Sequence, residues 1–366
     1  MHAIVSREGA QSAETSLAEL SLLVDTLGMN AVEKRTPRVQ RIHPKHYLGA
    51  GQIEAIAARA REVNAAAVVF NNELSPSQRL NLEDMFELAV LTRTDVILRI
   101  FSMRARTNIA KLQVELARLT FEYPRLKGTW STMSHTDAVT GKLGGPGETK
   151  LEYDRRHARE RMHAIRRDLA RAVKNMATGR KSRKDAFTCA LVGYTNAGKS
   201  TLFNALCNES AYVEDKLFAT LDTSTRKLYL GDDVRLDVVV SDTVGFIADL
   251  PHLLVESFTS TLAEVRDADL LVHVVDAEKE AVDRDMRSVE AVLAEIGAHD
   301  IPRLVVFNKC DRIDEYRSAI LRTANPEALR VSARMRTGID ELKEKIKGII
   351  LSSESGTRAA LRGNIV

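Results

Sequence analysis

The sequence is poor in cysteine, in tryptophan and in long apolar runs. Its three cysteines, Cys189, Cys207 and Cys310, are far apart and form no CxxC pair. An odd, scattered set supports neither a disulfide framework nor a zinc site. No run approaches the roughly 18 consecutive apolar residues of a membrane-spanning helix, and the opening residues MHAIVSREGAQ lack the apolar core of a signal peptide. These absences predict a soluble, cytoplasmic protein with reduced cysteines.

The charge, by contrast, is concentrated in one part of the chain. The 366 residues correspond to two or three domains at about 150 residues per domain. Residues 99–184 hold 21 Lys and Arg against 8 Asp and Glu, whereas residues 1–98 hold 10 against 12 and residues 185–366 hold 22 against 30. A basic block of this kind is typical of a partner rich in phosphate, above all a nucleic acid. The alternative is a solvated helical face.

Residues 1–98 alternate short apolar strands with helical stretches, which predicts a small α/β domain. A helix over Gln52–Val63 precedes a buried strand at Ala65–Phe70. Ser75 followed by Pro76 is a typical helix start, and that helix runs to about Glu87 before a strand at Leu88–Leu91.

Two helical seams follow and predict an antiparallel hairpin. The first lies between about Asp95 and Tyr123, and the second between Leu151 and Met176. Their apolar residues, at spacings of three and four, are Ile109, Leu112, Leu116 and Leu119, and then Ala158, Met162, Ile165, Leu169, Ala172 and Met176. The outer faces are predicted to carry Arg155, Arg156, Arg159, Arg161, Arg166, Arg167, Arg171 and Lys174.

A glycine-rich loop, roughly Gly128–Gly147, connects the two helices. A loop of this length is usually functional or disordered. Gly144–Gly147 (GGPG) allows a close backbone approach to another surface, and Trp130 offers a ring for stacking on an unpaired base. A solvent-facing tip is the alternative.

The strongest motif follows a basic linker at residues 179–186. Phe187–Val192 is a short apolar strand, and Gly193–Ser200 (GYTNAGKS) fits the phosphate-binding P-loop pattern GxxxxGKS ahead of a helix. In this motif backbone N–H groups surround the phosphates, the lysine (Lys199) neutralises their charge, and the hydroxyl of Ser200 binds magnesium.

Further boxes follow in the order expected of a GTPase. Asp242–Gly245 (DTVG) ends an apolar strand and supplies an aspartate for the magnesium site and a glycine amide for the γ-phosphate. Asn308–Asp311 (NKCD) follows another strand, and the carboxylate of Asp311 can accept two hydrogen bonds from guanine but not from adenine. Ser332 and Ala333 fit the backbone contact to the guanine ring. Between the first two boxes, Thr220 and Thr223 are both chemically able to sense the γ-phosphate.

One residue departs from the commonest GTPase pattern. Phe246 stands after the DTVG box, where a glutamine often orients the attacking water. Because a phenyl ring cannot orient water by hydrogen bonding, we expect slow intrinsic hydrolysis that a partner accelerates by about 10³- to 10⁵-fold.

Several segments together resemble the HflX family of translation GTPases, over roughly residues 15–350. They are Glu73–Gln78 (ELSPSQ), Gly144–Arg156 (GGPGETKLEYDRR), Gly193–Thr201 (GYTNAGKST), Phe218–Asp222 (FATLD), Asp242–Ile247 (DTVGFI) and Leu250–Phe258 (LPHLLVESF). The resemblance implies a GTPase that binds the 50S ribosomal subunit and dissociates stalled or stress-inactivated 70S ribosomes, with hydrolysis stimulated by the ribosome.

The resemblance also implies roles for parts of the chain. The N-terminal domain, the basic helical arm and the Gly-rich loop would contact ribosomal RNA, and the protein would be monomeric. Thr220 matches the magnesium-binding threonine of the first switch. Phe246 resembles the family in having an apolar side chain at its position. Many members have a further C-terminal domain, where this chain has about fifteen residues after its last predicted helix. Alternatives are a GTP-gated RNA-binding factor for large-subunit assembly that splits no 70S ribosomes, and a stand-alone signalling GTPase.

The predicted fold is α/β: a P-loop GTPase domain with a mixed, mostly parallel sheet and flanking helices, preceded by a small α/β domain and the long antiparallel hairpin. The expected boundaries are 1–98, 99–178, 179–186 for the linker, 187–351 for the GTPase domain and 352–366 for a short tail. Lys199, Thr220 and Gly245 are the expected catalytic residues, and Ser200 and Thr220 the expected ligands of Mg²⁺. The expected contacts to GTP or GDP are Gly193, Tyr194, Thr195, Asn196, Ala197, Gly198, Lys199, Ser200, Thr201, Phe218, Ala219, Thr220, Leu221, Asp222, Asp242, Thr243, Val244, Gly245, Asn308, Lys309, Asp311, Ser332, Ala333 and Arg334.

Overall fold

The computed structural model describes most of the chain in two compact units. The described residues are 1, 4–5, 10–125, 150–181, 186–207, 217–218, 224–231, 234, 237–248 and 258–354. One unit comprises Met1–Met103 with Leu112–Leu169, and the other Arg104–Lys111 with Ala170–Val366. The Gly-rich loop with Trp130, most of the basic linker and nearly all of the short tail lie outside the described residues.

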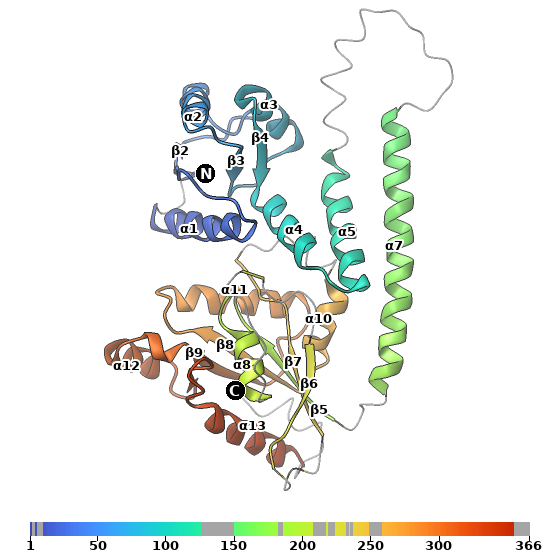
Figure 1. Ribbon diagram of the computed structural model, residues 1–366, viewed down its shortest axis with the longest axis vertical. Helices are drawn as coiled ribbons and strands as arrows, with labels where there is room; N and C mark the ends of the chain where they lie inside the picture. The colour runs from blue at the N-terminus through green and yellow to red at the C-terminus, as the bar shows by residue number, and fades with distance from the viewer. Residues whose placement is uncertain are drawn as a thin grey trace, which may run out of the picture. The chain divides into compact units, whose positions relative to one another are not determined.

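The N-terminal part is an α/β domain, as predicted (Figure 1). Two short parallel pairs, β1 with β2 and β3 with β4, form its strands. Phe70, Leu82 and Phe86 are among the side chains of its core with no exposed surface. The elements are β1 (Ile4–Val5), α1 (Ala10–Thr26), β2 (Arg38–Val39), α2 (Ala50–Glu62), β3 (Ala67–Phe70), α3 (Pro76–Phe86), β4 (Ala89–Thr92) and α4 (Arg93–Arg104).

Helix α3 begins where its sequence predicts. The hydroxyl of Ser75 accepts a hydrogen bond from the amide of Gln78, at 3.2 Å, and the side chain of Gln78 accepts one from the amide of Ser75, at 2.9 Å. This reciprocal pair, with Pro76 at the first helical position, satisfies amides that the helix leaves without partners. The helix ends at Phe86, and the next residue, Glu87, caps it with a left-handed backbone of φ 55°.

The prediction of one helix from Asp95 to Tyr123 is wrong. Helix α4 ends at Arg104, and a separate helix, α5, runs over Asn108–Glu122. The hydroxyl of Thr107 accepts a hydrogen bond from the amide of Ala110, at 3.1 Å, and so caps the new helix. All the apolar residues of the predicted seam lie in α5, after this break, and their spacing therefore gives no sign of it.

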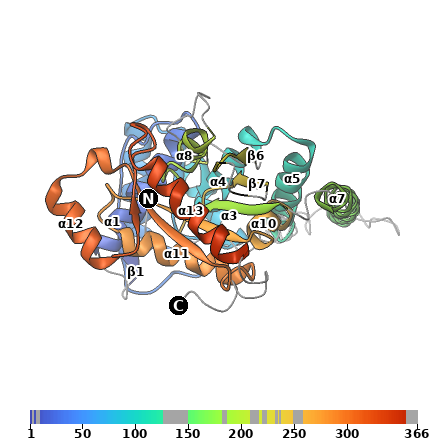
Figure 2. The same cartoon turned by 90° about the horizontal axis from the view of Figure 1, so that it is seen from below.

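Helices α5 and α7 (Lys150–Lys181) form the predicted antiparallel hairpin (Figures 1 and 2). Glu115 pairs with Arg161 through two hydrogen bonds of 2.7 and 2.8 Å, and further along α5 the ring of Tyr123 lies under Arg155. Contacts that advance along α5 while they retreat along α7 define the antiparallel direction. Leu116, Met162 and Ile165 are the buried centre of the seam, flanked by Leu112, Leu119, Tyr123 and Leu169.

The basic residues of α7 do not all lie on its outer face, which corrects the sequence prediction. Arg155 is half-buried at the seam, 5.4 Å above the ring of Tyr123, and Arg161 forms the ion pair with Glu115 across the hairpin. Arginine carries a long apolar stem and a planar head, and it can therefore serve as a seam residue. Among the described side chains of α7, the exposed basic residues are Arg156, Arg159, Arg161, Arg166, Arg167, Arg171 and Lys174.

The second unit is built on a six-stranded mixed sheet with flanking helices, as predicted. The strand order is β10-β9-β8-β5-β7-β6, and only the pairing of β6 with β7 is antiparallel. The strands are β5 (Phe187–Val192), β6 (Ser224–Leu228), β7 (Val238–Asp242), β8 (Leu270–Asp276), β9 (Arg303–Asn308) and β10 (Leu329–Arg330). The helices are α8 (Lys199–Leu206), α10 (Thr259–Arg266), α11 (Val282–Glu295), α12 (Glu315–Ala324) and α13 (Ile339–Glu354).

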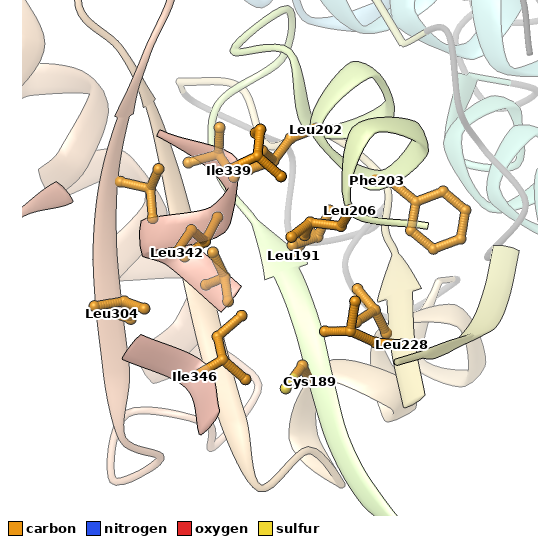
Figure 3. Close-up of a cluster of buried hydrophobic side chains, with 14 of the residues drawn as sticks. Cys189, Leu191, Leu202, Phe203, Leu206, Leu228, Leu304, Ile339, Leu342 and Ile346 are labelled. Carbon is orange, nitrogen blue, oxygen red and sulfur yellow. The ribbon is translucent and has the colours of Figure 1, made fainter. Parts of the chain in front are cut away.

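Each face of this sheet has its own apolar core. On one face Leu202 and Leu206 of α8 and Leu342 and Ile346 of α13 pack on β5, β8 and β9 (Figure 3). On the other face Val275 and Phe307 pack with Val282 of α11 and Leu321 of α12. Successive residues of a strand point to opposite faces, so both faces of the central strands are apolar. The parallel strands end at one edge, where a ligand site is expected.

No helix in the described part of the chain is long and apolar enough to cross a membrane. All three cysteines are free, and Cys189 is buried inside β5. Burial, with the nearby charge of Asp269, raises the pKa of the Cys189 thiol well above its usual range. The cysteines are therefore packing residues, as the sequence indicates.

Candidate functional site

The loop between β5 and α8 contains two glycines that no other residue can replace without strain. The backbone of Gly193 has φ of 151°, and a Cβ atom there would lie 2.2 Å from the carbonyl oxygen of Val274. Gly198 has φ of 87°, and its Cβ would lie 2.3 Å from Nδ2 of Asn308. Left-handed backbone and missing space both require glycine. The two glycines of the GxxxxGKS pattern are thus explained by contacts with β8 and β9.

Lys199 is a buried cation whose amine lies inside this loop. Its Nζ donates hydrogen bonds to the carbonyl oxygens of Gly193, at 3.1 Å, and Tyr194, at 3.0 Å. Burial lowers the pKa of Lys199 to about 8, and the opposing charge of Asp242 limits that decrease. A buried amine that has carbonyl partners, and no carboxylate partner among the described residues, is suited to an anion that enters the loop.

Ser200 and Asp242 bring two oxygen ligands together at the start of α8. The hydroxyl of Ser200 donates to a carboxylate oxygen of Asp242 across 2.6 Å. The next residue, Thr243, is fixed by a hydrogen bond of 2.6 Å from its hydroxyl to the carbonyl oxygen of Leu191. Hydroxyl and carboxylate oxygens suit a hard cation such as Mg²⁺, and this pair therefore fits the predicted metal.

The segment after Asp242 packs directly on the phosphate loop. A Cβ atom on Gly245 would lie 2.8 Å from Cα of Thr195 and 3.1 Å from Nζ of Lys199. The amide of Phe246 donates to the carbonyl oxygen of Gly193, and its carbonyl oxygen accepts from the amide of Thr195. The phenyl ring of Phe246 is buried. Phe246 therefore acts here through its backbone and its packing, because its ring has no polar atom to offer water.

The guanine-recognition boxes are held together by side-chain hydrogen bonds that sequence reasoning missed. Asn308 donates to the carbonyl oxygen of Ala197, at 2.9 Å, and accepts from the amide of Ala333, at 3.0 Å. It thereby links the phosphate loop to the loop after β10. The sequence signal for this bridge is limited to an asparagine at the end of an apolar strand.

The acidic residue of the NKxD box is exposed and held at one oxygen. Asp311 accepts a hydrogen bond of 2.6 Å from the hydroxyl of Ser332, which itself accepts from the amide of Met335. Lys309 has left-handed backbone, and its amine pairs with the carboxylate of Asp276 at 2.7 Å. One carboxylate oxygen is thus oriented by the protein while the group still faces solvent, as recognition of a base edge requires.

Most of the predicted site residues gather at this edge of the sheet. Val244 is buried, Thr201 is half-buried, and Arg334 is exposed. Phe218 is buried, and its amide donates to the hydroxyl of Thr195 at 3.0 Å. The other first-switch residues, Ala219, Thr220, Leu221 and Asp222, lie outside the described residues, as does Thr223.

A second group of contacts that the motifs do not indicate surrounds Tyr194. Its phenol oxygen accepts a hydrogen bond from the amide of Ala248, at 2.8 Å, and the amine of Lys279 lies 4.1 Å from the centre of its ring. Lys279 follows β8 and forms an ion pair of 2.6 Å with Asp285. Both partners are distant in sequence, so the P-loop pattern gives no sign of them.

The sheet, the phosphate loop, the DTVG box and the two guanine boxes define a P-loop GTPase. Comparison with known sequences identifies the family. The chain matches the families described as "GTP-binding GTPase N-terminal" over residues 14–102, "GTP-binding GTPase Middle Region" over 104–183 and "50S ribosome-binding GTPase" over 188–309.

Curated relatives named GTPase HflX cover most of the chain. The protein from Caldanaerobacter subterraneus is 43% identical over 336 residues, which span 91% of this chain and 77% of the relative. That from Escherichia coli is 43% identical over 332 residues, with 89% and 77% covered. That from Alkalihalophilus pseudofirmus is 41% identical over 361 residues, with 97% and 84% covered. The chain belongs to the HflX family of GTPases, binds GTP and GDP, and hydrolyses GTP.

Proposed function

We propose that this protein binds the 50S ribosomal subunit and, in its GTP state, dissociates stalled or stress-inactivated 70S ribosomes in the cytoplasm. The observation that carries the proposal is an exposed basic face on a preformed helical arm, in the same chain as a P-loop GTPase site. Seven of the described basic side chains of α7 are exposed, while its seam is packed on α5. Neutralisation of RNA phosphates releases counterions and supplies most of the binding free energy of such a surface. The family membership supports the ribosome as the RNA partner.

The nucleotide is proposed to lie along the edge of the sheet from Gly193 to Ser332. Amides of the phosphate loop would surround the α- and β-phosphates at the start of α8, and Lys199 would leave its two carbonyl partners to meet the β- and γ-phosphates. Asp311 would accept from the guanine edge, and the Ala333 region would contact the ring. The other proposed contacts are Tyr194, Thr195, Asn196, Ala197, Gly198, Ser200, Thr201, the first-switch segment 218–222, Asp242, Thr243, Val244, Gly245, Asn308, Lys309 and Arg334.

Ser200 and Thr220 are the proposed Mg²⁺ ligands, and Asp242 would hold the metal through a water molecule. Bound Mg²⁺ would offset the negative charge of the phosphates. Ser200 and Asp242 already lie within hydrogen-bond distance, so the chain preorganises this half of the site. The backbone of Gly245 can lie close to Lys199 because glycine carries no side chain.

The proposal that the ribosome stimulates hydrolysis depends on the phenyl side chain of Phe246. Its buried ring cannot orient the attacking water, and the described part of the site offers no glutamine in its place. We propose that the ribosome supplies the missing stabilisation, so that GTP persists until the protein has bound its target. The protein is proposed to act as a monomer, with the N-terminal domain, the arm and the Gly-rich loop on ribosomal RNA.

Sucrose-gradient profiles of purified 70S ribosomes test the proposal. Addition of the protein with a non-hydrolysable GTP analogue is expected to convert the 70S peak into 50S and 30S peaks, with the protein on the 50S peak. GDP and the variant Lys199→Ala are the matched controls and should leave the 70S peak intact. An unchanged 70S peak with protein bound to 50S would contradict splitting and favour large-subunit assembly. Absence from every ribosomal peak would contradict the ribosomal role.

A further inference from the structure

Three hydrogen bonds join the phosphate loop to the segment after Gly245. The amide of Thr195 donates to the carbonyl oxygen of Phe246 across 2.6 Å. The amide of Phe246 donates to the carbonyl oxygen of Gly193 across 3.1 Å. The third runs from the amide of Ala248 to the phenol oxygen of Tyr194, across 2.8 Å. The first two use backbone atoms alone. The third depends on a side chain, and it can be removed without a change in backbone.

The environment of Tyr194 fixes the direction of its phenol group. The residue is 5% exposed, and the amine of Lys279 lies over its ring. Lys279 is in turn held by Asp285. A cation over an aromatic face is attractive, and a buried ring with one face covered has few alternative rotamers. The phenol oxygen is therefore a preorganised acceptor for the amide of Ala248, which is also buried.

The segment that this acceptor holds is the one that must be placed accurately for hydrolysis. Gly245 lies beside Lys199, and Phe246 stands where many GTPases place a water-orienting side chain. Since the Phe246 ring cannot orient water, the chain controls this region chiefly through backbone position. A misplacement of about 1 Å near the reacting atoms can lower a rate by about 10²-fold.

We propose that Tyr194 is a positioning residue for GTP hydrolysis, whose phenol oxygen holds the amide of Ala248 and thereby keeps Gly245 and Phe246 on the phosphate loop. The proposal rests on the proposed placement of the nucleotide phosphates in that loop. It assigns to the side chain of Tyr194 a role separate from nucleotide binding, since the nucleotide contact proposed for this residue is made by its backbone in the phosphate loop. The hydroxyl is engaged by Ala248, whereas the loop amides and Lys199 are unaffected by its removal.

The variant Tyr194→Phe tests the role, because it keeps the ring and removes only the oxygen. Single-turnover GTP hydrolysis, alone and with 50S subunits, is expected to slow about fivefold, which corresponds to about 1 kcal/mol. The dissociation constants for GDP and a non-hydrolysable GTP analogue are expected to stay within about twofold of the wild type, as for an interaction that matters only in the transition state. Tyr316→Phe is the matched control, because Tyr316 on α12 is 76% exposed.

Amide hydrogen exchange of the intact protein provides a second measurement. Exchange at Ala248 is expected to be faster in Tyr194→Phe than in the wild type and unchanged in Tyr316→Phe. Unchanged hydrolysis, unchanged exchange at Ala248, or a loss of nucleotide affinity equal to the loss of rate would each overturn the proposal. A failure of the nucleotide placement itself is distinguishable, because wild-type protein would then take up neither GDP nor the analogue.

Discussion

The side-chain amide of Asn308 lies 2.9 Å from the carbonyl oxygen of Ala197, and this hydrogen bond ties the end of β9 to the phosphate loop. Residues 111 positions apart are thereby joined at the point where a nucleotide would pass from phosphate to base. The same side chain accepts from the amide of Ala333. A single buried residue thus connects three loops of the site.

Asn308→Asp is expected to weaken the binding of GDP and GTP together. The new carboxylate would face the carbonyl oxygen of Ala197 and lose the donor, and a buried unpaired polar group costs about 1–3 kcal/mol. That cost corresponds to a loss of about 5- to 150-fold in affinity, measurable by calorimetry. A loss confined to guanine selectivity, with phosphate affinity intact, would contradict the bridging role.

Lys199→Ala is expected to abolish measurable GTP turnover by removing the buried cation of the phosphate loop. We expect a loss of at least about 10²-fold, as for other preorganised charges at a developing anion. Lys227→Ala is the control, since Lys227 is an exposed lysine of the same unit, paired with Asp237. Phosphate release, measured with both variants, compares their rates of GTP turnover. Normal turnover in Lys199→Ala would refute the P-loop assignment.

Asp311→Asn is expected to change which base the site prefers. An asparagine amide can donate to the second carbonyl of xanthine but cannot accept both hydrogen bonds of guanine. Affinity for GDP should fall by up to about 10⁴-fold, the range seen when a buried hydrogen-bonding site meets the wrong group, while affinity for xanthosine diphosphate rises. Competition binding measures both. Retention of full guanine preference would contradict the role assigned to Asp311.

Replacement of Arg159, Arg166 and Arg167 by Gln is expected to reduce the salt dependence of 50S binding. Each phosphate contact contributes about 0.7–0.9 to the slope of log affinity against log salt concentration, so the three together contribute about 2 to 3. These residues are chosen because they are exposed, whereas Arg155 belongs to the hairpin seam. The control replaces Lys227, Arg322 and Lys345, exposed cations of the GTPase unit. Equal slopes for the two triple variants would place the RNA contact elsewhere.

His273 is expected to make the fold sensitive to acid. Burial in β8, with the charges of Arg303 and Lys199, lowers the pKa of His273 to about 4. The unfolded chain, with a histidine pKa of about 6.5, binds more protons between these values, so stability falls as pH decreases from about 6.5 to 4. The loss attributable to this group is on the order of 3 kcal/mol.

Urea unfolding of the wild type and of His273→Leu at pH 7 and pH 5 measures this contribution. The variant is expected to lose less stability than the wild type over the same pH interval. Equal losses in both proteins would show that His273 does not carry the acid sensitivity.

Local sequence patterns predicted much of the fold and the loops that come together at the candidate site. The cap at Ser75 depends on residues three positions apart, and the hairpin seam on spacings of three and four, so both are visible in sequence. The phosphate loop is equally local. Close contacts with Val274 and Asn308 require glycine at positions 193 and 198. The spacing of these two glycines in the sequence is therefore enough to recognise the loop.

Contacts between distant segments escaped prediction for a physical reason. The hydrogen bond from Ala248 to Tyr194 joins residues 54 positions apart, and that from Ser332 to Asp311 joins residues 21 apart. No periodicity encodes such pairs, because they depend on how the strands are ordered in the sheet. The break at Thr107 escaped for another reason, since the apolar residues of the predicted seam begin only at Ile109 and do not report on the chain before it.

The burial of Cys189 makes the chain convenient to label. Thiol reagents attack the thiolate, and a buried thiol with a raised pKa forms very little of it. Cys207 and Cys310 are only half-buried, so they should react first, and their replacement by serine would leave a nearly unreactive background. A cysteine introduced at an exposed position of α7 would then accept a single dye and report by fluorescence when the helix meets a large particle.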